Sequence, residues 1–235
     1  MIPKTNGRRC KMFPSSHSGT SGSHPEGIDP SLRHNALAHR LVRSDALPGA
    51  HKNVVFDCTQ TERFGLRGPG TMDWLGSTGV SAPAAVNTTL TLPCGTSVLR
   101  LGQQEVLLAA PPGGSGARLR ELRKAWQDSE LPAKGYDAYR DEGWAWFVVS
   151  GPAAPALMRR ISMADLRPES LKLAHLAQTR ALHLDAVVAR FDRFGAVSYD
   201  IFVDIASAPF ALDVLTETAA GTHCGFQFAA LCATK

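Results

Sequence analysis

Cysteines, histidines and one glycine-rich segment are the residues of this chain that could bind a metal or a phosphate. The five cysteines are Cys10, Cys58, Cys94, Cys224 and Cys232, and no two of them have the C-x-x-C spacing of a zinc or redox site. The eight histidines form neither H-x-x-x-H nor H-E-x-x-H. The segment GGSG at residues 113–116 lacks the glycine spacing of a phosphate-binding loop. We therefore expect no metal site, and a simple turn at residues 113–116.

The carboxylate and hydroxyl groups of an apolar strand, YDIFVDI at residues 199–205, are the next candidates. Side chains alternate between the two faces of a strand. Tyr199 should therefore point to one side and Asp200 to the other, each together with the residues two and four positions further along. This alternation by itself accounts for both residues in structural terms, so Tyr199 and Asp200 have either a structural role or a role in binding.

Two further polar groups stand beside strands. Gln178 and Thr179 form a polar pair before an apolar strand, where such side chains either order a loop or contact a ligand. Arg67 and Arg100 each lie at a turn or a strand end, where a guanidinium suits either a surface ion pair or an anionic ligand.

The composition excludes several classes of function. Of the 235 residues 44% are hydrophobic and 20% are charged, as in ordinary soluble globular proteins. The net charge is only +4, and four basic residues lie in the first eleven positions, so a nucleic-acid partner is not expected. No apolar run approaches the roughly 20 residues of a membrane helix, so no membrane contact is expected either.

The odd, scattered cysteines indicate reduced thiols and a cytoplasmic location. Cys94, at a turn, is the most exposed candidate thiol, and nothing nearby in the sequence is expected to lower its pKa.

The order of elements predicts a mixed α+β domain at residues 31–235. Residues 1–30 are rich in Ser, Gly and Pro and have no acidic residue before Glu26, which predicts a disordered tail. Hydrophobic periodicity predicts strands at 54–57, 63–68, 88–92, 97–100, 105–110, 144–150, 185–191 and 199–205. It predicts helices at 31–42, 71–78, 117–128, 154–161 and 208–218.

A strand–turn–helix pattern occurs twice. FGLRGPGTMDWL at residues 64–75 and FVVSGPAAPALM at residues 147–158 each run from an apolar strand through Gly-Pro into a short helix. The two Gly-Pro pairs begin at Gly68 and Gly151, and an apolar strand follows later in each case, EVLLAA and DIFVDI. The repeat predicts two related α+β halves, about residues 54–128 and 142–220, packed as a pseudo-dimer.

Taken in order, the motifs of both halves resemble the gamma subunits of heterotetrameric sarcosine oxidase. The resemblance runs from about Arg63 to Leu215 and rests on F-G-x-x-G-P-x-x-x-x-W-L, R-L-G-x-x-E, S-G-P, the D-L after it, and A-Q-T. Those subunits are shortened relatives of the glycine-cleavage T-protein, an aminomethyltransferase, and share its folate-binding fold. The resemblance therefore implies an aminomethyltransferase folate-binding-type domain for residues 31–235.

The catalytic part of the aminomethyltransferase pattern is missing. Those enzymes carry an essential aspartate in a Gly-Gly-x-x-x-Asp-Asp segment, which reads CGTSVL here at residues 94–99 and has no carboxylate. Their Tyr-Thr-Gly-Glu run is absent too, because FGAVSYD at residues 194–200 keeps only a tyrosine and one acid. Threonine and serine do not ionise at neutral pH and cannot replace an aspartate in proton transfer. We therefore expect no catalytic residues in this chain.

The resemblance implies a non-catalytic, gamma-type subunit of a heterotetrameric flavoenzyme. Such an enzyme oxidatively demethylates sarcosine (N-methylglycine) or a related N-methyl amine and transfers the one-carbon unit to tetrahydrofolate. FAD, FMN and NAD are then implied on the larger flavoprotein subunits, which are the expected partners.

On this chain, the residues that could face folate are Arg67, Gln178, Thr179, Tyr199 and Asp200. The alternative is a free-standing tetrahydrofolate-binding protein or an aminomethyltransferase-like one-carbon carrier. For that alternative, Asp200 and Asp185 are the candidate carboxylates.

Overall fold

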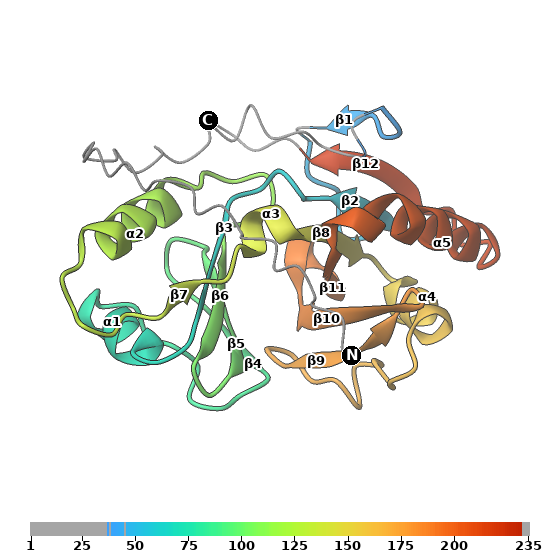
Figure 1. Ribbon diagram of the computed structural model, residues 1–235. Helices are drawn as coiled ribbons and strands as arrows, with labels where there is room; N and C mark the ends of the chain where they lie inside the picture. Colours follow the sequence, from blue (N-terminus) through green and yellow to red (C-terminus); the bar gives the residue numbers. More distant parts are fainter. Residues whose placement is uncertain (1–36, 38, 45, 232–235) are drawn as a thin grey trace, which may run out of the picture.

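Two β-sheets with helices on their outer sides make up the fold (Figure 1). The computed structural model of the chain describes residues 37, 39–44 and 46–231, so the tail expected at residues 1–30 lies outside the described residues. The seven-stranded sheet has the order β1-β12-β2-β8-β11-β10-β9, and the five-stranded sheet has the order β4-β5-β6-β3-β7. The mixed α+β class expected from the sequence is confirmed.

The elements follow one another in both halves with similar lengths. The strands are β1 (Arg43–Ser44), β2 (Val54–Asp57), β3 (Arg63–Arg67), β4 (Thr88–Thr91), β5 (Ser97–Gly102), β6 (Glu105–Ala109), β7 (Tyr136–Asp137), β8 (Trp144–Ser150), β9 (Leu176–Ala181), β10 (Leu184–Phe191), β11 (Ser198–Asp204) and β12 (Gln227–Leu231). The α-helices are α1 (Thr71–Ser77), α2 (Ala117–Asp128), α3 (Arg140–Gly143), α4 (Ala154–Ile161) and α5 (Ala208–Ala220), with 3-10 turns η2 (Arg193–Gly195) and η3 (Ile205–Ser207).

Each expected strand forms, within two residues of its expected bounds, and so does each expected helix except the first. Of the helix expected at 31–42, the described residues 37, 39 and 40 form a turn, residues 41 and 42 are not helical, and the others lie outside the described part of the chain. The strands β1, β7, β9 and β12 and the short helix α3 were not expected. β9 (LAQTRA) is an edge strand, half exposed and poor in β-branched residues, so its hydrophobic pattern is weak.

The two halves have the same strand order. Antiparallel pairing gives β3-β6-β5-β4 in the five-stranded sheet and β8-β11-β10-β9 in the seven-stranded sheet. β3 and β8 are the strands that end at the two Gly-Pro turns, so the pseudo-repeat in the sequence corresponds to a repeat in topology. The bounds of the two halves stay a prediction.

The halves also exchange the strands that lead into them. β2 precedes β3 along the chain but pairs with β8, whereas β7 precedes β8 but pairs with β3. Each sheet therefore contains the strand that leads into the other half, which ties the two parts of the chain together.

The Gly-Pro glycines lie against these exchanged segments. Gly151 has φ of 121°, and a Cβ there would lie 2.4 Å from the carbonyl oxygen of Lys52, just before β2. Gly68 has φ of 103°, and its Cβ would lie 2.9 Å from the ring of Tyr136 in β7. Only glycine combines this backbone conformation with so close an approach.

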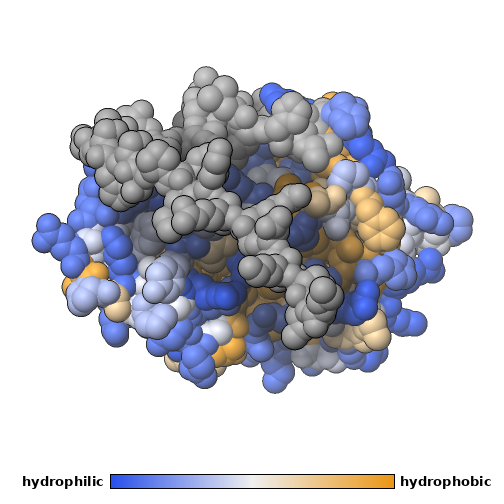
Figure 2. Space-filling model, viewed as in Figure 1, coloured by the Kyte–Doolittle hydropathy of each residue, from blue (hydrophilic) through white to orange (hydrophobic). Residues whose placement is uncertain are grey.

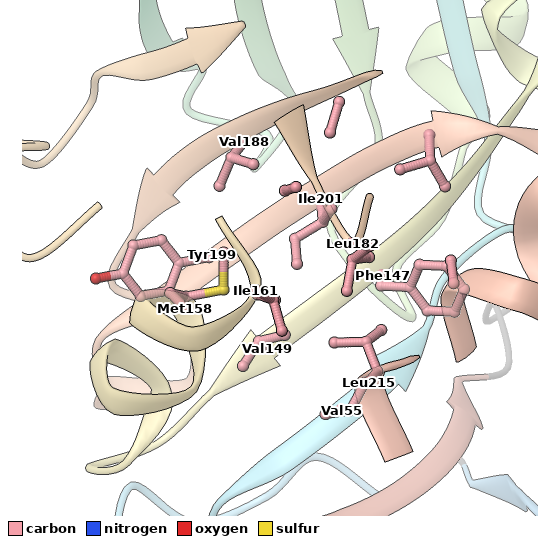
Figure 3. Packing of buried hydrophobic residues seen from close by; sticks show 14 of the residues in the cluster. Val55, Phe147, Val149, Met158, Ile161, Leu182, Val188, Tyr199, Ile201 and Leu215 are labelled. Carbon is pink, nitrogen blue, oxygen red and sulfur yellow. The ribbon is translucent and has the colours of Figure 1, made fainter. Parts of the chain in front are cut away.

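Three buried apolar clusters divide the molecule into layers. One lies between α4, α5 and the seven-stranded sheet, and Figure 3 shows part of it. A second lies between the two sheets, and a third lies between the five-stranded sheet and α1 with α2. The order is therefore helix, sheet, sheet, helix, and a polar side chain that points between the sheets lies in the middle of the protein.

Candidate functional site

A groove of about 600 Å³ lies where the seven-stranded sheet extends past the inter-sheet core. Its lining comes from four adjacent strands: Trp144, Gln178, Thr179, Arg180, Asp185, Ala186, Val187, Phe202 and Asp204. Register places Trp144 opposite Asp204 and Asp185 opposite Arg180. This volume lies in the range of small-molecule sites, and the groove brings together two of the expected residues, Gln178 and Thr179.

The groove has two carboxylates that the sheet itself does not neutralise. Asp204 accepts the backbone N–H of Ala206 on Oδ1 at 2.8 Å, which caps η3. Asp185 makes no hydrogen bond or ion pair within the described part of the chain. The guanidinium of Arg180, directly across from Asp185, donates to the carbonyl oxygen of His183 at 2.9 Å. Asp185 is thus the carboxylate with free capacity for a ligand.

Gln178 joins the two sheets. Its amide nitrogen donates to Oδ1 of Asn87 at 2.9 Å and to the carbonyl oxygen of Leu101 at 2.6 Å. Both acceptors belong to the first half of the chain, so the amide of Gln178 is used to hold β9 against the five-stranded sheet. Thr179 is the member of the pair whose side chain is not used in this way.

Asp200 lies fully buried between the sheets and is paired with Arg193. The guanidinium donates from Nε to Oδ1 at 2.8 Å and from Nη2 to Oδ2 at 2.7 Å. Burial raises the pKa of Asp200, and the charge and hydrogen bonds of the Arg193 guanidinium oppose that rise. Both carboxylate oxygens of Asp200 are therefore occupied by a side chain of the same protein.

The segment without a carboxylate, residues 94–99, borders this pair. Ser97, buried on β5, accepts a hydrogen bond from Nη2 of Arg193 at 3.3 Å. The backbone N–H of Arg193 donates to Ser198 Oγ at 2.9 Å. The polar centre between the sheets thus holds one arginine that donates hydrogen bonds to one carboxylate and two hydroxyls.

Sequence reasoning did not find Arg193. It lies in η2, where Phe194 has φ of 58°, and this tight turn folds the guanidinium back onto β11. The run R-F-D-R-F-G before the strand contains two arginines, Arg190 and Arg193, and only the turn geometry decides which of them reaches Asp200. An arginine seven residues before a buried aspartate is the one available signal, and it is a weak one.

Tyr199 points to the opposite face of β11, as the alternation predicts. Its ring lies beside Met158 in the cluster under α4 (Figure 3), and its hydroxyl donates to the carbonyl oxygen of Leu166 at 2.8 Å. Burial raises the pKa of Tyr199 to about 12. Tyr199 therefore lies on the other side of the sheet from the groove.

Arg67 lies in a second pocket, of about 460 Å³, on the five-stranded sheet. The same pocket is lined by Tyr136, Tyr139 and Arg140. The guanidinium of Arg140 lies 4.0 Å from the ring centroid of Trp144, which lines the groove, so this contact separates the two pockets. The five expected residues thus occupy four places: the groove, the buried centre, the helix-side core and the second pocket.

The thiol Cys94 differs from the expectation. Its Sγ lies 3.3 Å from Thr96 Oγ1, and hydrogen bonds that Thr96 donates to the thiolate lower the pKa of Cys94. The sequence alone led us to expect no nearby group that lowers this pKa. Among the described residues, no group of three or more His, Cys, Asp or Glu side chains could hold a metal ion. Within the same part of the chain, every helix is too short or too polar to cross a bilayer.

Comparison with known proteins supports the fold. No protein-family profile and no curated protein sequence matches this chain. A chain of heterotetrameric sarcosine oxidase from Corynebacterium sp. U-96, in complex with pyrrole 2-carboxylate, superposes with a TM-score of 0.63 and 24% identity, over 83% of this chain and 98% of that one. The glycine cleavage system aminomethyltransferase T from Bartonella henselae superposes with a TM-score of 0.54 and 16% identity, over 76% of this chain and 48% of that one.

These similarities show that the chain has an aminomethyltransferase-like fold, as the sequence motifs implied. The chain spans about half the length of the aminomethyltransferase that it matches. Since one fold carries many functions, the similarity alone assigns no activity to this chain.

Proposed function

We propose that this chain is a non-catalytic, gamma-type subunit of a heterotetrameric flavoenzyme like sarcosine oxidase. The observation that carries the proposal is the extent of the superposition, which covers 98% of a chain from such a heterotetramer. That matched chain is somewhat shorter than this one, because the same superposition covers only 83% of the residues here. The whole of one small subunit is therefore matched, rather than one domain of a large catalytic chain.

The polar centre supports a non-catalytic role. A group that transfers a proton needs access to the substrate, but Asp200 is fully buried and both its oxygens accept hydrogen bonds from Arg193. The neighbouring segment at residues 94–99 offers only the hydroxyls of Thr96 and Ser97 and the thiol of Cys94. The buried pair supports the packing of the two sheets, and no accessible acid remains there.

The residues expected to face tetrahydrofolate do not fit that role together. A bound pterin needs donors and acceptors converging on one pocket, whereas Asp200, Tyr199 and the amide of Gln178 are each bonded internally and lie in different layers. We propose that folate and the flavin and nicotinamide cofactors (FAD, FMN and NAD) belong to the larger subunits. The substrate would be sarcosine or a related N-methyl amine, and the assembly cytoplasmic.

Apolar surface supports assembly with other chains. Met163 on the loop before β9, Leu173, Phe210 and Leu47 are all about half exposed or more. In the view of Figure 2, hydrophobic residues gather toward the middle and right of the face, and hydrophilic residues form much of its rim. Exposed apolar surface of this kind marks sites of protein contact.

The test is to purify the tagged chain from its own host and measure the native mass and visible spectrum of what accompanies it. We expect a species several times heavier than the chain, with flavin absorbance and N-methyl amine oxidation. The chain produced alone in a different host is the matched control, and it should be colourless. A colourless species of one or two chains from the native host would contradict the proposal. Tetrahydrofolate binding to that species, abolished by Asp185→Asn, would then favour the free-standing folate protein.

A further inference from the structure

Two tyrosines next to Arg67 form an exposed surface on the five-stranded sheet that the fold itself does not require. We call the residues Arg67, Tyr136 and Tyr139 the tyrosine–arginine surface. Tyr136 and Tyr139 are 71% and 68% exposed, the largest exposures of any aromatic side chain among the described residues. All three residues line the second pocket, which also contains Arg140.

The polar ends of this surface are free. The guanidinium of Arg67 and the hydroxyls of both tyrosines make no hydrogen bond or ion pair within the described part of the chain. By contrast, the charged neighbours are paired: Arg140 donates to Glu105 Oε1 at 2.5 Å, and Asp137 Oδ2 accepts from Arg123 at 2.7 Å. The pocket therefore carries one uncompensated positive charge, that of Arg67.

The backbone holds the tyrosines in place at a cost. Tyr139 has φ of 50° and ψ of 35°, a left-handed conformation that is unfavourable for a bulky residue. Its N–H donates to Asp137 Oδ1 at 2.8 Å, which fixes this conformation. The ring of Tyr136 lies against Gly68, whose missing Cβ makes the room. The fold therefore fixes the backbone of Tyr139 and places the ring of Tyr136 against Gly68, although neither ring contributes to a buried core.

The shallow shape decides between a small molecule and a protein. Small-molecule sites bury most of the ligand between their walls, but walls that are about 70% exposed cannot enclose one. Tyrosine and arginine are the residue types enriched at the energetic centres of protein–protein interfaces. The uncompensated charge of Arg67 selects a partner segment that carries a carboxylate.

From these observations we infer that the tyrosine–arginine surface docks an acidic segment of the larger subunit. This inference rests on the proposed function, since it names the contact through which the chain would join its assembly. In the complex, a partner carboxylate lies on Arg67, and the two tyrosine rings are covered by the segment on either side of it.

The chain contains only three tyrosines, which makes a direct test available. Tyrosine nitration followed by peptide mass spectrometry is applied to the chain alone and to the native assembly. In the chain alone, Tyr136 and Tyr139 should react, while the buried Tyr199 stays unmodified as an internal control. In the assembly, Tyr136 and Tyr139 should lose most of their reactivity. Equal reactivity of the two residues in both samples would overturn the inference.

A charge reversal supplies the second measurement. Arg67→Glu should weaken the association with the larger subunit by about 30-fold or more, as expected for an interfacial arginine. Arg159→Glu is the matched control. Arg159 is an exposed arginine on α4, far from this surface, and its substitution changes the net charge by the same amount. Assembly of Arg67→Glu as tight as that of Arg159→Glu would also overturn the inference.

The wild-type chain separates this inference from the proposed function. If the wild type joins a flavin-containing assembly while nitration and Arg67→Glu show no effect, only the docking surface is wrong. If the wild type joins no larger chain, both fail. Protection of Tyr136 and Tyr139 in the isolated chain by inorganic phosphate would show a small-anion site instead, and would overturn the docking inference.

Discussion

Arg63 and Trp146 occupy matching positions in the two halves and contact each other. Each lies five residues before the glycine of its Gly-Pro turn, Gly68 for Arg63 and Gly151 for Trp146. The guanidinium carbon of Arg63 lies 5.8 Å from the centroid of the Trp146 ring. Both side chains are essentially unexposed, so the contact lies on the boundary between the halves. Equivalent positions of the two repeats are therefore in contact here, although one is an arginine and the other a tryptophan.

Replacing Arg63 should destabilise the whole protein. Its guanidinium donates to the carbonyl oxygens of Cys58, Thr59, Arg140, Asp141 and Trp144, which belong to both halves. Arg63→Met leaves these buried acceptors without a donor, which should lower the free energy of unfolding by about 3 kcal/mol or more. Urea titration measures this value. Arg159→Met is the control, and an equally small effect of both variants would contradict the prediction.

The Arg193–Asp200 pair should show strong coupling. Arg193→Met or Asp200→Leu alone leaves a buried partner unpaired and should each cost about 3–5 kcal/mol. The double variant removes both polar groups, so its cost should be well below the sum of the two single costs. Urea titration of the four proteins gives the coupling free energy, and additive costs would show that the pair is not a unit.

The pH dependence of stability should reveal the burial of Tyr199. Because the folded pKa of about 12 lies above the usual 10.0, the unfolded chain loses this proton first as the pH rises. The contribution of Tyr199 to stability is therefore fully present below pH 10 and is lost between about pH 10 and 12, by up to 1.4 kcal/mol per unit of pH. Tyr199→Phe lacks this loss. The free energies of unfolding of the wild type and of Tyr199→Phe, measured by urea titration at a series of pH values, should therefore converge between about pH 10 and 12. A constant difference would contradict the burial of the hydroxyl.

Two thiols should differ in reactivity. Hydrogen bonds from Thr96 lower the pKa of the exposed Cys94, whereas burial raises that of Cys58. Since the thiolate is the reactive form, iodoacetamide at neutral pH should label Cys94 early and Cys58 only after unfolding. Peptide mass spectrometry distinguishes the sites. Thr96→Val should slow the labelling of Cys94 and leave that of Cys58 unchanged.

Local patterns predicted the elements and the direction of their side chains. Alternation along β11 placed Tyr199 and Asp200 on opposite faces, and the structure confirms it. The Gly-Pro turns marked β3 and β8, because the approach of an exchanged segment excludes any side chain there. Information within about ten residues was sufficient for these features.

Long-range pairing was beyond what the sequence could predict. The run VVFD at residues 54–57 indicated a strand, which the structure shows as β2. Nothing in those four residues indicates that this strand pairs with β8 of the other half. The same limit applies to the candidate site: Asp200 was found by its position in an apolar strand, while its partner Arg193 depends on the turn at Phe194. Gln178 was recognised as polar, but its bonds to Asn87 and Leu101 depend on how the two sheets meet.

The strand exchange sets the order in which this protein can fold during synthesis. β2 leaves the ribosome early, but its antiparallel neighbour β8 is made only after every strand of the five-stranded sheet, β7 included. Until then β2 presents an unpaired apolar edge, which is the kind of surface that chaperones protect and that aggregates form from. We therefore expect β2 to stay without its partner in the sheet until residues 144–150 have been synthesised.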